Sequence, residues 1–208
     1  MPLETKIYER GNSLNLKKLF KETLSDVYRS RFLARQLASR DIKSQYRQSF
    51  LGIFWAFLMP LSTAFVWIFI NDSGAVELAD TGVPYPLFVF SGTLLFSALT
   101  EAINMPLTAT NGAKSLFTKI NIPKEAIILA GLYKLLYNDM FKMILLVFFF
   151  VFFSVTPTWG MLLFPISFFI LTLVGITIGL LITPLGLLYN DVAKVISLSL
   201  RFIMFITP

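Results

Sequence analysis

The sequence predicts an all-α integral membrane protein, with N-terminal amphipathic interfacial helices followed by a transmembrane helix bundle. Of its 208 residues, 56% are hydrophobic and only 14% are charged, whereas soluble domains carry about 25% charged residues. No charge occurs from Met143 to Asn190, a run long enough for two membrane spans of about 20 residues each. We therefore divide the chain into an interfacial region, residues 1–49, and a transmembrane domain, residues 50–208.

Composition also narrows the function. The chain has no Cys and no His, which excludes disulfides, zinc–thiolate sites, Cys nucleophiles and His-based acid–base catalysis. The net charge is +6, and residues 1–50 hold eleven Lys and Arg against five acids. Because this basic region adjoins a membrane span, we expect membrane lipids with anionic headgroups as its partner, and no nucleic acid.

Two amphipathic helices are predicted before the first span. The first covers residues 14–28, where apolar side chains recur at helical spacing; it fits both the inner membrane surface and the protein's own cytoplasmic face. The second covers residues 30–49, and three cations share one side of it: Arg40, Lys43 and Arg47. Its neighbouring side carries Ile42, Tyr46 and Phe50. This pattern suits either a helix at the lipid surface or a basic flank that only anchors the span.

Apolar runs of sufficient length predict four spans and part of a fifth. They cover residues 50–70, 85–107, 132–154 and 160–183, and the fifth segment begins at about 192–202. Pro157 lies in the turn between the third and fourth spans, because proline breaks a helix. Only seven residues follow Arg201. We expect either a fragment of a longer membrane domain or a last segment that is not a full span.

The distribution of Lys and Arg between the loops predicts the orientation. Eleven precede the first span, none lies in residues 71–84, three lie in 108–125, none in 155–159 and two in 189–201. Cytoplasmic loops carry the excess of Lys and Arg. We therefore expect a multi-pass protein of the cytoplasmic membrane with its N-terminus in the cytoplasm.

Four charged residues are predicted within the spans, where charge is costly and marks functional or structural sites. One of them, Lys134, is expected to extend to the inner surface. Glu101 either reaches the inner interface or faces the bundle interior, where it would bond to a neighbour or serve a proton or substrate path. Asp139 and Lys142 are three residues apart on one helix, so we expect them to form a structural ion pair. Nothing in the sequence places Glu101 beside Asp139.

Other side chains indicate surfaces and helix contacts. One face of the first span carries a mixed polar and aromatic stripe, which is a candidate pore face or an ordinary packing face. It consists of Trp55, Met59, Ser62, Val66 and Phe69. Gly175 and Gly179 form a Gly-x-x-x-Gly pair, which allows close helix approach within the bundle.

The loop of residues 108–125 carries a short apolar edge beside cations. Leu116, Phe117 and Ile120 form this edge, and Lys119 lies next to it. It suits either a groove on a cytoplasmic partner or a connector folded onto the membrane surface. Residues 112–115 lack the full P-loop pattern. We therefore expect no ATPase site in this chain, so that any ATP is used by a partner.

A motif of ten positions runs through residues 40–60. It reads Arg-Asp-x-Lys-x-x-Tyr-Arg-x-Ser-x-Leu-Gly-x-x-Trp-x-x-x-x-Pro and falls on Arg40, Asp41, Lys43, Tyr46, Arg47, Ser49, Leu51, Gly52, Trp55 and Pro60. In this order and spacing it resembles the first-span motif of ABC type-2 permeases, the membrane subunits that export O-antigen, capsule polysaccharide or teichoic acid. Residues 121–125 resemble the family's segment after the coupling helix. Residues 189–192 resemble a second cytoplasmic motif, in which Asn190 here stands in place of an Arg.

The resemblance implies a function and a set of partners. It implies a six-span permease, paired as a homodimer and docked on an ATP-binding-cassette ATPase subunit, that exports a lipid-linked polysaccharide across the inner membrane. ATP and Mg would be bound by the partner, and no cofactor by this chain. The expected substrate gate is a helix carrying Arg40, Asp41, Lys43, Tyr46 and Arg47. The expected ATPase coupling residues are Leu116, Phe117, Lys119, Ile120 and Asp191.

Two other functions stay open. A proton-coupled membrane carrier would use Glu101 and Asp139 and would need no ATPase. A membrane-embedded lipid-linked sugar transferase would need a carboxylate cluster or a metal motif on a loop, and neither is visible in the sequence.

Single cysteines test the predicted orientation. Ser73→Cys lies beside the acidic loop predicted to be outside, and Ser115→Cys lies in the basic loop predicted to be inside. An impermeant thiol reagent added to intact cells should label the first variant and spare the second, because the chain has no other Cys. Equal labelling of the two variants would contradict the orientation.

Overall fold

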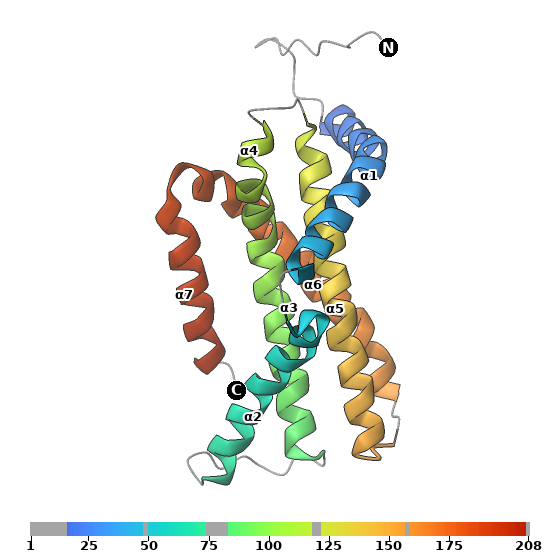
Figure 1. Cartoon of the computed structure of the whole chain (residues 1–208), viewed down its shortest axis with the longest axis vertical. Helices are drawn as coiled ribbons and strands as arrows, with labels where there is room; N and C mark the ends of the chain where they lie inside the picture. Colours follow the sequence, from blue (N-terminus) through green and yellow to red (C-terminus); the bar gives the residue numbers. More distant parts are fainter. Residues whose placement is uncertain (1–15, 48–49, 74–82, 118–121, 157–158, 207–208) are drawn as a thin grey trace.

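The computed structural model describes residues 16–47, 50–73, 83–117, 122–156 and 159–206. Within these residues the secondary structure is helical, and no strand occurs (Figure 1). The long helices are α1 (Leu16–Arg47), α2 (Trp55–Asp72), α3 (Tyr85–Gly112), α5 (Lys124–Phe152), α6 (Trp159–Leu188) and α7 (Asn190–Ile206). A short 3-10 turn, η1 (Gly52–Phe54), precedes α2, and the one-turn helix α4 (Lys114–Phe117) follows α3. The predicted all-α class is confirmed.

Four helical segments among the described residues are long and apolar enough to cross a membrane. They are Gly52–Asp72, Tyr85–Phe117, Lys124–Phe152 and Trp159–Leu188, with mean hydropathies of 2.1, 1.5, 1.9 and 2.4. Each overlaps one of the predicted spans. The helices extend beyond the apolar runs, because adding a residue to an existing helix is far easier than starting one. The predicted fifth apolar segment lies in α7.

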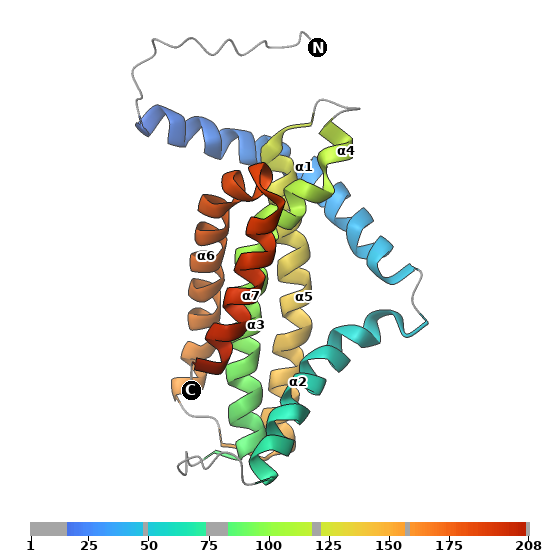
Figure 2. The ribbon, with the colours of Figure 1, turned by 90° about the vertical axis from the view of Figure 1, so that its left-hand side faces the viewer.

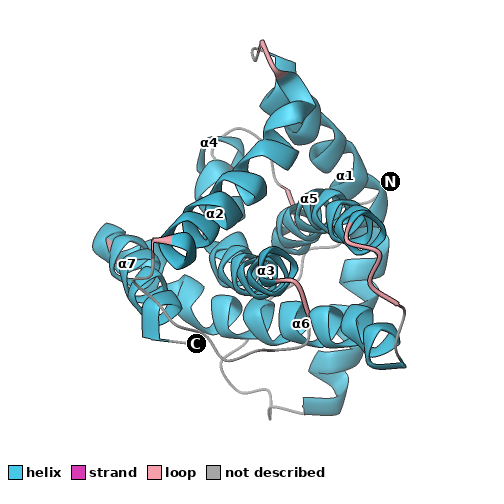
Figure 3. Ribbon diagram, turned by 90° about the horizontal axis from the view of Figure 1, so that it is seen from below, coloured by secondary structure: helices cyan, strands magenta, loops and turns pink. Residues whose placement is uncertain are grey.

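α3 is the central helix of the bundle. It contacts α2, α5, α6 and α7, and it lies in the middle of the end-on view in Figure 3. Leu87 and Phe90 on its first half are buried in one apolar cluster with Leu146 of α5 and Phe168 of α6. The ring centroid of Phe90 is 4.7 Å from that of Phe149 on α5. This core holds the three longest spans together.

α3 and α6 approach each other closely where α6 has small residues. A Cβ atom at Gly175 would lie 2.7 Å from Cβ of Ala102, and a Cβ atom at Gly179 would meet the carbonyl oxygen of Ile103. Such contacts are shorter than any that a real side chain makes, so only glycine fits at both positions. The close helix approach predicted from the Gly-x-x-x-Gly pair is confirmed.

α1 is one helix from Leu16 to Arg47, whereas the sequence predicted a break near residue 29. No Gly or Pro occurs between its ends, so nothing local stops the helix. Its middle packs on α5 through small side chains, since Ala34, Ala38 and Ala130 are 0%, 3% and 5% exposed. Figure 2 shows the first part of α1 across the end of the bundle and its last part descending beside α5.

The directions of the helices place the predicted outer loops on one side. The end of α2, the start of α3 and the end of α5 lie together at the end of the bundle opposite α4 (Figure 2). The connections at residues 71–84 and 155–159 therefore leave from the same end, although parts of both lie outside the described residues. Which end faces the cytoplasm stays a prediction.

Gly179→Ala should lower the stability of the bundle, because the added methyl group meets the backbone of α3, which cannot swing aside. Overpacking of this kind costs about 1–3 kcal/mol. Gly92→Ala is the matched control, since a Cβ atom there meets nothing within 4 Å; alanine should leave the stability unchanged or raise it. Thermal unfolding in detergent compares the two variants, and equal midpoints would contradict the close approach.

Candidate functional site

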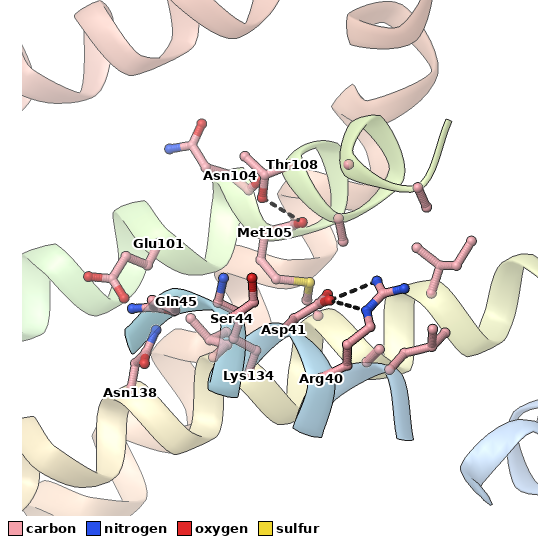
Figure 4. Close-up of a pocket in the computed structure, with 18 of the residues that line it drawn as sticks. Arg40, Asp41, Ser44, Gln45, Glu101, Asn104, Met105, Thr108, Lys134 and Asn138 are labelled. Atoms are coloured by element: carbon pink, nitrogen blue, oxygen red, sulfur yellow. Dashed lines mark hydrogen bonds and ion pairs between the residues drawn. The ribbon is translucent and has the colours of Figure 1, made fainter. Parts of the chain in front are cut away.

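A cavity of about 670 Å³ lies between the last turns of α1 and the facing sides of α3 and α5 (Figure 4). Residues three and four apart share one face of a helix, which explains the side chains that line it. From α1 they are Leu37, Arg40, Asp41, Ser44 and Gln45. From α3 they include Glu101, Asn104 and Thr108, and from α5 Lys134 and Asn138. The cavity therefore combines these polar side chains with apolar ones such as Met105, Ile127 and Leu135, and two of its walls belong to candidate membrane spans.

The cations that line the cavity differ in what they contact. Nε and Nη2 of Arg40 donate hydrogen bonds to Oδ1 of Asp41, at 2.9 and 2.7 Å, so a neighbour in the chain holds this guanidinium. Lys134 lines the same cavity from α5, and it forms no ion pair with any residue in the described ranges. Its ammonium group is therefore the cation best placed to meet an anionic ligand.

A cluster of three charges lies behind the cavity wall. Nζ of Lys142 is 2.8 Å from Oε1 of Glu101 and 3.0 Å from Oδ1 of Asp139. The side chains of Lys142 and Asp139 are 7% and 3% exposed, whereas that of Glu101 is 43% exposed and lines the cavity. The contact with Asp139 agrees with the predicted pair, and the contact with Glu101 was not predicted. The cluster joins α3 to α5.

Two buried oxygen atoms beside this cluster lack hydrogen-bond partners among the described residues. They are Oδ1 of Asn138 and Oδ2 of Asp139. A buried acceptor without a donor costs about 1–3 kcal/mol, and such atoms are rare in folded proteins. Their presence at adjacent positions, one of them in the cavity wall, distinguishes this region from ordinary helix packing.

The structure separates the residues predicted for the substrate gate. Arg40 and Asp41 line the cavity. Lys43 and Arg47 are exposed and do not line it. Tyr46 belongs to α1, but its side chain lies outside what the structure describes. A gating role for these residues therefore stays a prediction.

The five residues of the predicted pore face do not pack within the chain. Trp55, Met59, Val66 and Phe69 are 43%, 63%, 58% and 75% exposed, and Ser62 is exposed as well. Whether they line a pore is untested.

The residues predicted to couple to an ATPase lie near one end of the bundle, as far as they are described. Leu116 and Phe117 end α4 and are half-buried, while Lys119 and Ile120 lie outside the described residues. Asp191 is in the first turn of α7, with Oδ1 3.8 Å from Nζ of Lys194. α4 and the start of α7 lie at the same end of the bundle (Figure 1).

Sequence reasoning missed most of the uncharged polar residues of the cavity, namely Ser44, Gln45, Asn104, Thr108 and Asn138. A signal was present, since Asn104 and Thr108 follow Glu101 at helical spacing in a predicted span, and Asn138 follows Lys134. Polar side chains on one face of a membrane helix turn toward the bundle interior. A search for such stripes would have found two of the three walls.

Lys142→Met should destabilise the bundle strongly, because it leaves two carboxylates without their cation, one of them buried. Removing one partner of a buried ion pair costs about 3–5 kcal/mol. Lys194→Met is the matched control, since its pair with Asp191 has side chains 83% and 88% exposed, and such surface pairs contribute about 0–1 kcal/mol. Thermal unfolding in detergent measures both. A midpoint for Lys142→Met equal to that of the control would refute a structural role for the cluster.

Comparison with known proteins adds the family. No family model matches the chain. The chain is 24% identical over 183 residues to the O-antigen export system permease protein RfbA of Myxococcus xanthus. This alignment covers 88% of this chain and 69% of that protein. It is 26% identical over 182 residues to the protein of the same name from Klebsiella pneumoniae, in an alignment that covers 83% of this chain and 66% of that protein.

Both relatives are named as permeases, the class that the motif at residues 40–60 predicted. The matches extend over most of this chain and about two thirds of each relative. The described helices include four of membrane-spanning length, as a multi-pass membrane protein requires. The motif, the two relatives and the helical bundle together support the assignment of this chain to the ABC type-2 permease family.

Proposed function

We propose that this chain is the transmembrane subunit of an ATP-binding-cassette exporter that moves a lipid-linked polysaccharide across the cytoplasmic membrane. The polysaccharide would be of O-antigen, capsule or teichoic-acid type. Two relatives named as O-antigen export permeases support the proposal. The observation that carries it is the open cavity between α1, α3 and α5, whose polar side chains offer a substrate headgroup a place among the spans.

The chemistry of the cavity suits a phosphate followed by sugar units. Lys134 supplies a cation for the phosphate. The carboxylates add little repulsion, because Asp41 is held by Arg40 and Glu101 is held by Lys142. Sugar hydroxyl groups would exchange hydrogen bonds with the polar side chains of the walls, which are Ser44, Gln45, Asn104, Thr108 and Asn138.

A partner subunit would bind ATP and Mg and would drive the movement. The partner is expected at the end of the bundle that carries α4 (Figure 1). Ala113, directly before α4, and Leu116, within α4, also line the cavity. A push on α4 would therefore act directly on the cavity wall. Two copies of the chain would form the translocation path, as is usual for closed homodimers, with the exposed face of α2 turned toward it.

A proton-coupled carrier is the second candidate, and the three-charge cluster favours it. Asp139 is buried, and its Oδ2 has no hydrogen-bond partner among the described residues, so this oxygen has room to hold a proton. The two functions differ in their energy source. Transport that vanadate inhibits would favour the exporter, and transport that vanadate leaves unchanged would favour the carrier.

Lys134→Gln should lower export of polysaccharide to the cell surface. A hydrogen bond to a charged group contributes about 1.5–3 kcal/mol, so binding of the phosphate should weaken about tenfold or more. Lys134→Arg should retain export, because charge and donors remain. Lys21→Gln is the control, because Lys21 is an exposed cation of α1 that does not line the cavity. The measurement is surface polysaccharide at matched protein level, and undiminished export in Lys134→Gln would remove this lysine from the site.

A further inference from the structure

A second cavity, of about 430 Å³, lies where the end of α3, the helix α4, the start of α5 and the end of α6 come together. It shares no lining residue with the first cavity. Phe117, Ile128 and Leu187 give it an apolar lining, and Lys114 and Lys124 add two ammonium groups. The proposed headgroup site does not use this cavity; only Phe117 of its lining is also expected to couple to the ATPase, so a separate role is sought for the space itself.

The wall of this cavity is apolar even where its residues are polar. Thr110 and Thr183 line it, but each hydroxyl donates to a carbonyl oxygen of its own helix. Oγ1 of Thr110 is 2.7 Å from the oxygen of Pro106, and Oγ1 of Thr183 is 2.7 Å from the oxygen of Gly179. Both threonine hydroxyl hydrogens are therefore donated within the chain, and the apolar residues Phe117, Ile128 and Leu187 offer hydrocarbon contact.

The two lysines bring positive charge that the chain does not neutralise. Lys114 and Lys124 are both exposed, and neither forms an ion pair with any residue in the described part of the chain. Lys142 and Lys194, in contrast, each lie within 4 Å of a carboxylate oxygen. An anion that reached the mouth of the cavity would meet two ammonium groups that no carboxylate of the described residues already binds.

The position of the cavity matches the level of a membrane surface. The candidate spans Tyr85–Phe117 and Trp159–Leu188 end there, and Lys124–Phe152 begins there. Lysine at the ends of spans extends toward lipid headgroups. Tyr189, which directly follows α6, is 66% exposed, and tyrosine is enriched at this level of membrane proteins. A recess at this depth opens onto both acyl chains and headgroups.

We infer that this cavity binds an anionic phospholipid of the surrounding leaflet, with the phosphate between Lys114 and Lys124 and an acyl chain against Ile128 and Leu187. Basic pockets between membrane helices bind anionic headgroups in this way. A free phosphate would use the lysines but leave the apolar wall empty. Apart from the two lysines, a protein partner would find no free side-chain donor in the wall, because both threonine hydroxyls already donate within α3 and α6.

The test compares lipids on the whole chain, purified in a neutral detergent. Native mass spectrometry measures bound phosphatidylglycerol, phosphatidylcholine with the same acyl chains, and inorganic phosphate. Phosphatidylglycerol should bind, and the double variant Lys114→Gln/Lys124→Gln should weaken it roughly twentyfold, since each lysine contributes about fivefold. The double variant Lys21→Gln/Lys194→Gln, which alters exposed cations outside the cavity, should bind as the wild type does.

A second variant addresses the apolar wall and guards against a general charge effect. Leu187→Trp fills the cavity and keeps both lysines, so it should also weaken phosphatidylglycerol binding. Unchanged binding in the lysine double variant would overturn the inference, as would equal binding of the two lipids. Inorganic phosphate that displaces phosphatidylglycerol would make the site one for a free anion. If the lysine double variant lost a co-purified ATPase but kept its bound lipid, the cavity would be a protein docking site instead.

Discussion

The buried ammonium group of Lys142 is the interaction on which the arrangement of the spans depends. In a medium of low dielectric constant a charge persists only beside a partner. Lys142 has two partners, Glu101 on α3 and Asp139 on its own helix. Because one of them belongs to another helix, the pairing fixes the height of α3 against α5. That height sets which polar side chains of the two helices face each other across the cavity.

Close contacts at glycine residues also fix the position of α3 against α6 and against α5. α6 reaches α3 at Gly175 and Gly179, and at Gly131 of α5 a Cβ atom would lie 2.6 Å from Sδ of Met105. Lipid tails are as apolar as leucine, so burial of apolar surface does not drive membrane helices together; close packing and buried polar contacts do. The bundle uses both, with charge and glycine between α3 and α5 and glycine between α3 and α6.

What the sequence predicted and what it missed follow from one physical distinction. The spans and the Asp139–Lys142 pair were predictable, because hydrophobic length and i,i+3 spacing are properties of a single segment. The contact of Lys142 with Glu101 was not, since it depends on which faces of two helices meet. The unbroken α1 was missed because two amphipathic segments were predicted on either side of residue 29, although no helix-breaking residue stands there.

The contact between α1 and α5 is made by the small side chains Ala34, Ala38 and Ala130, and their size affects the cavity beside it. Ala34 and Ala38 are almost fully covered, yet neither lines the cavity that α1 helps to enclose. Their size sets the spacing between the two helices, and with it the width of the chamber beyond. Under the proposed function, the size of headgroup that fits is therefore adjustable at Ala34 and Ala38, which do not line the cavity.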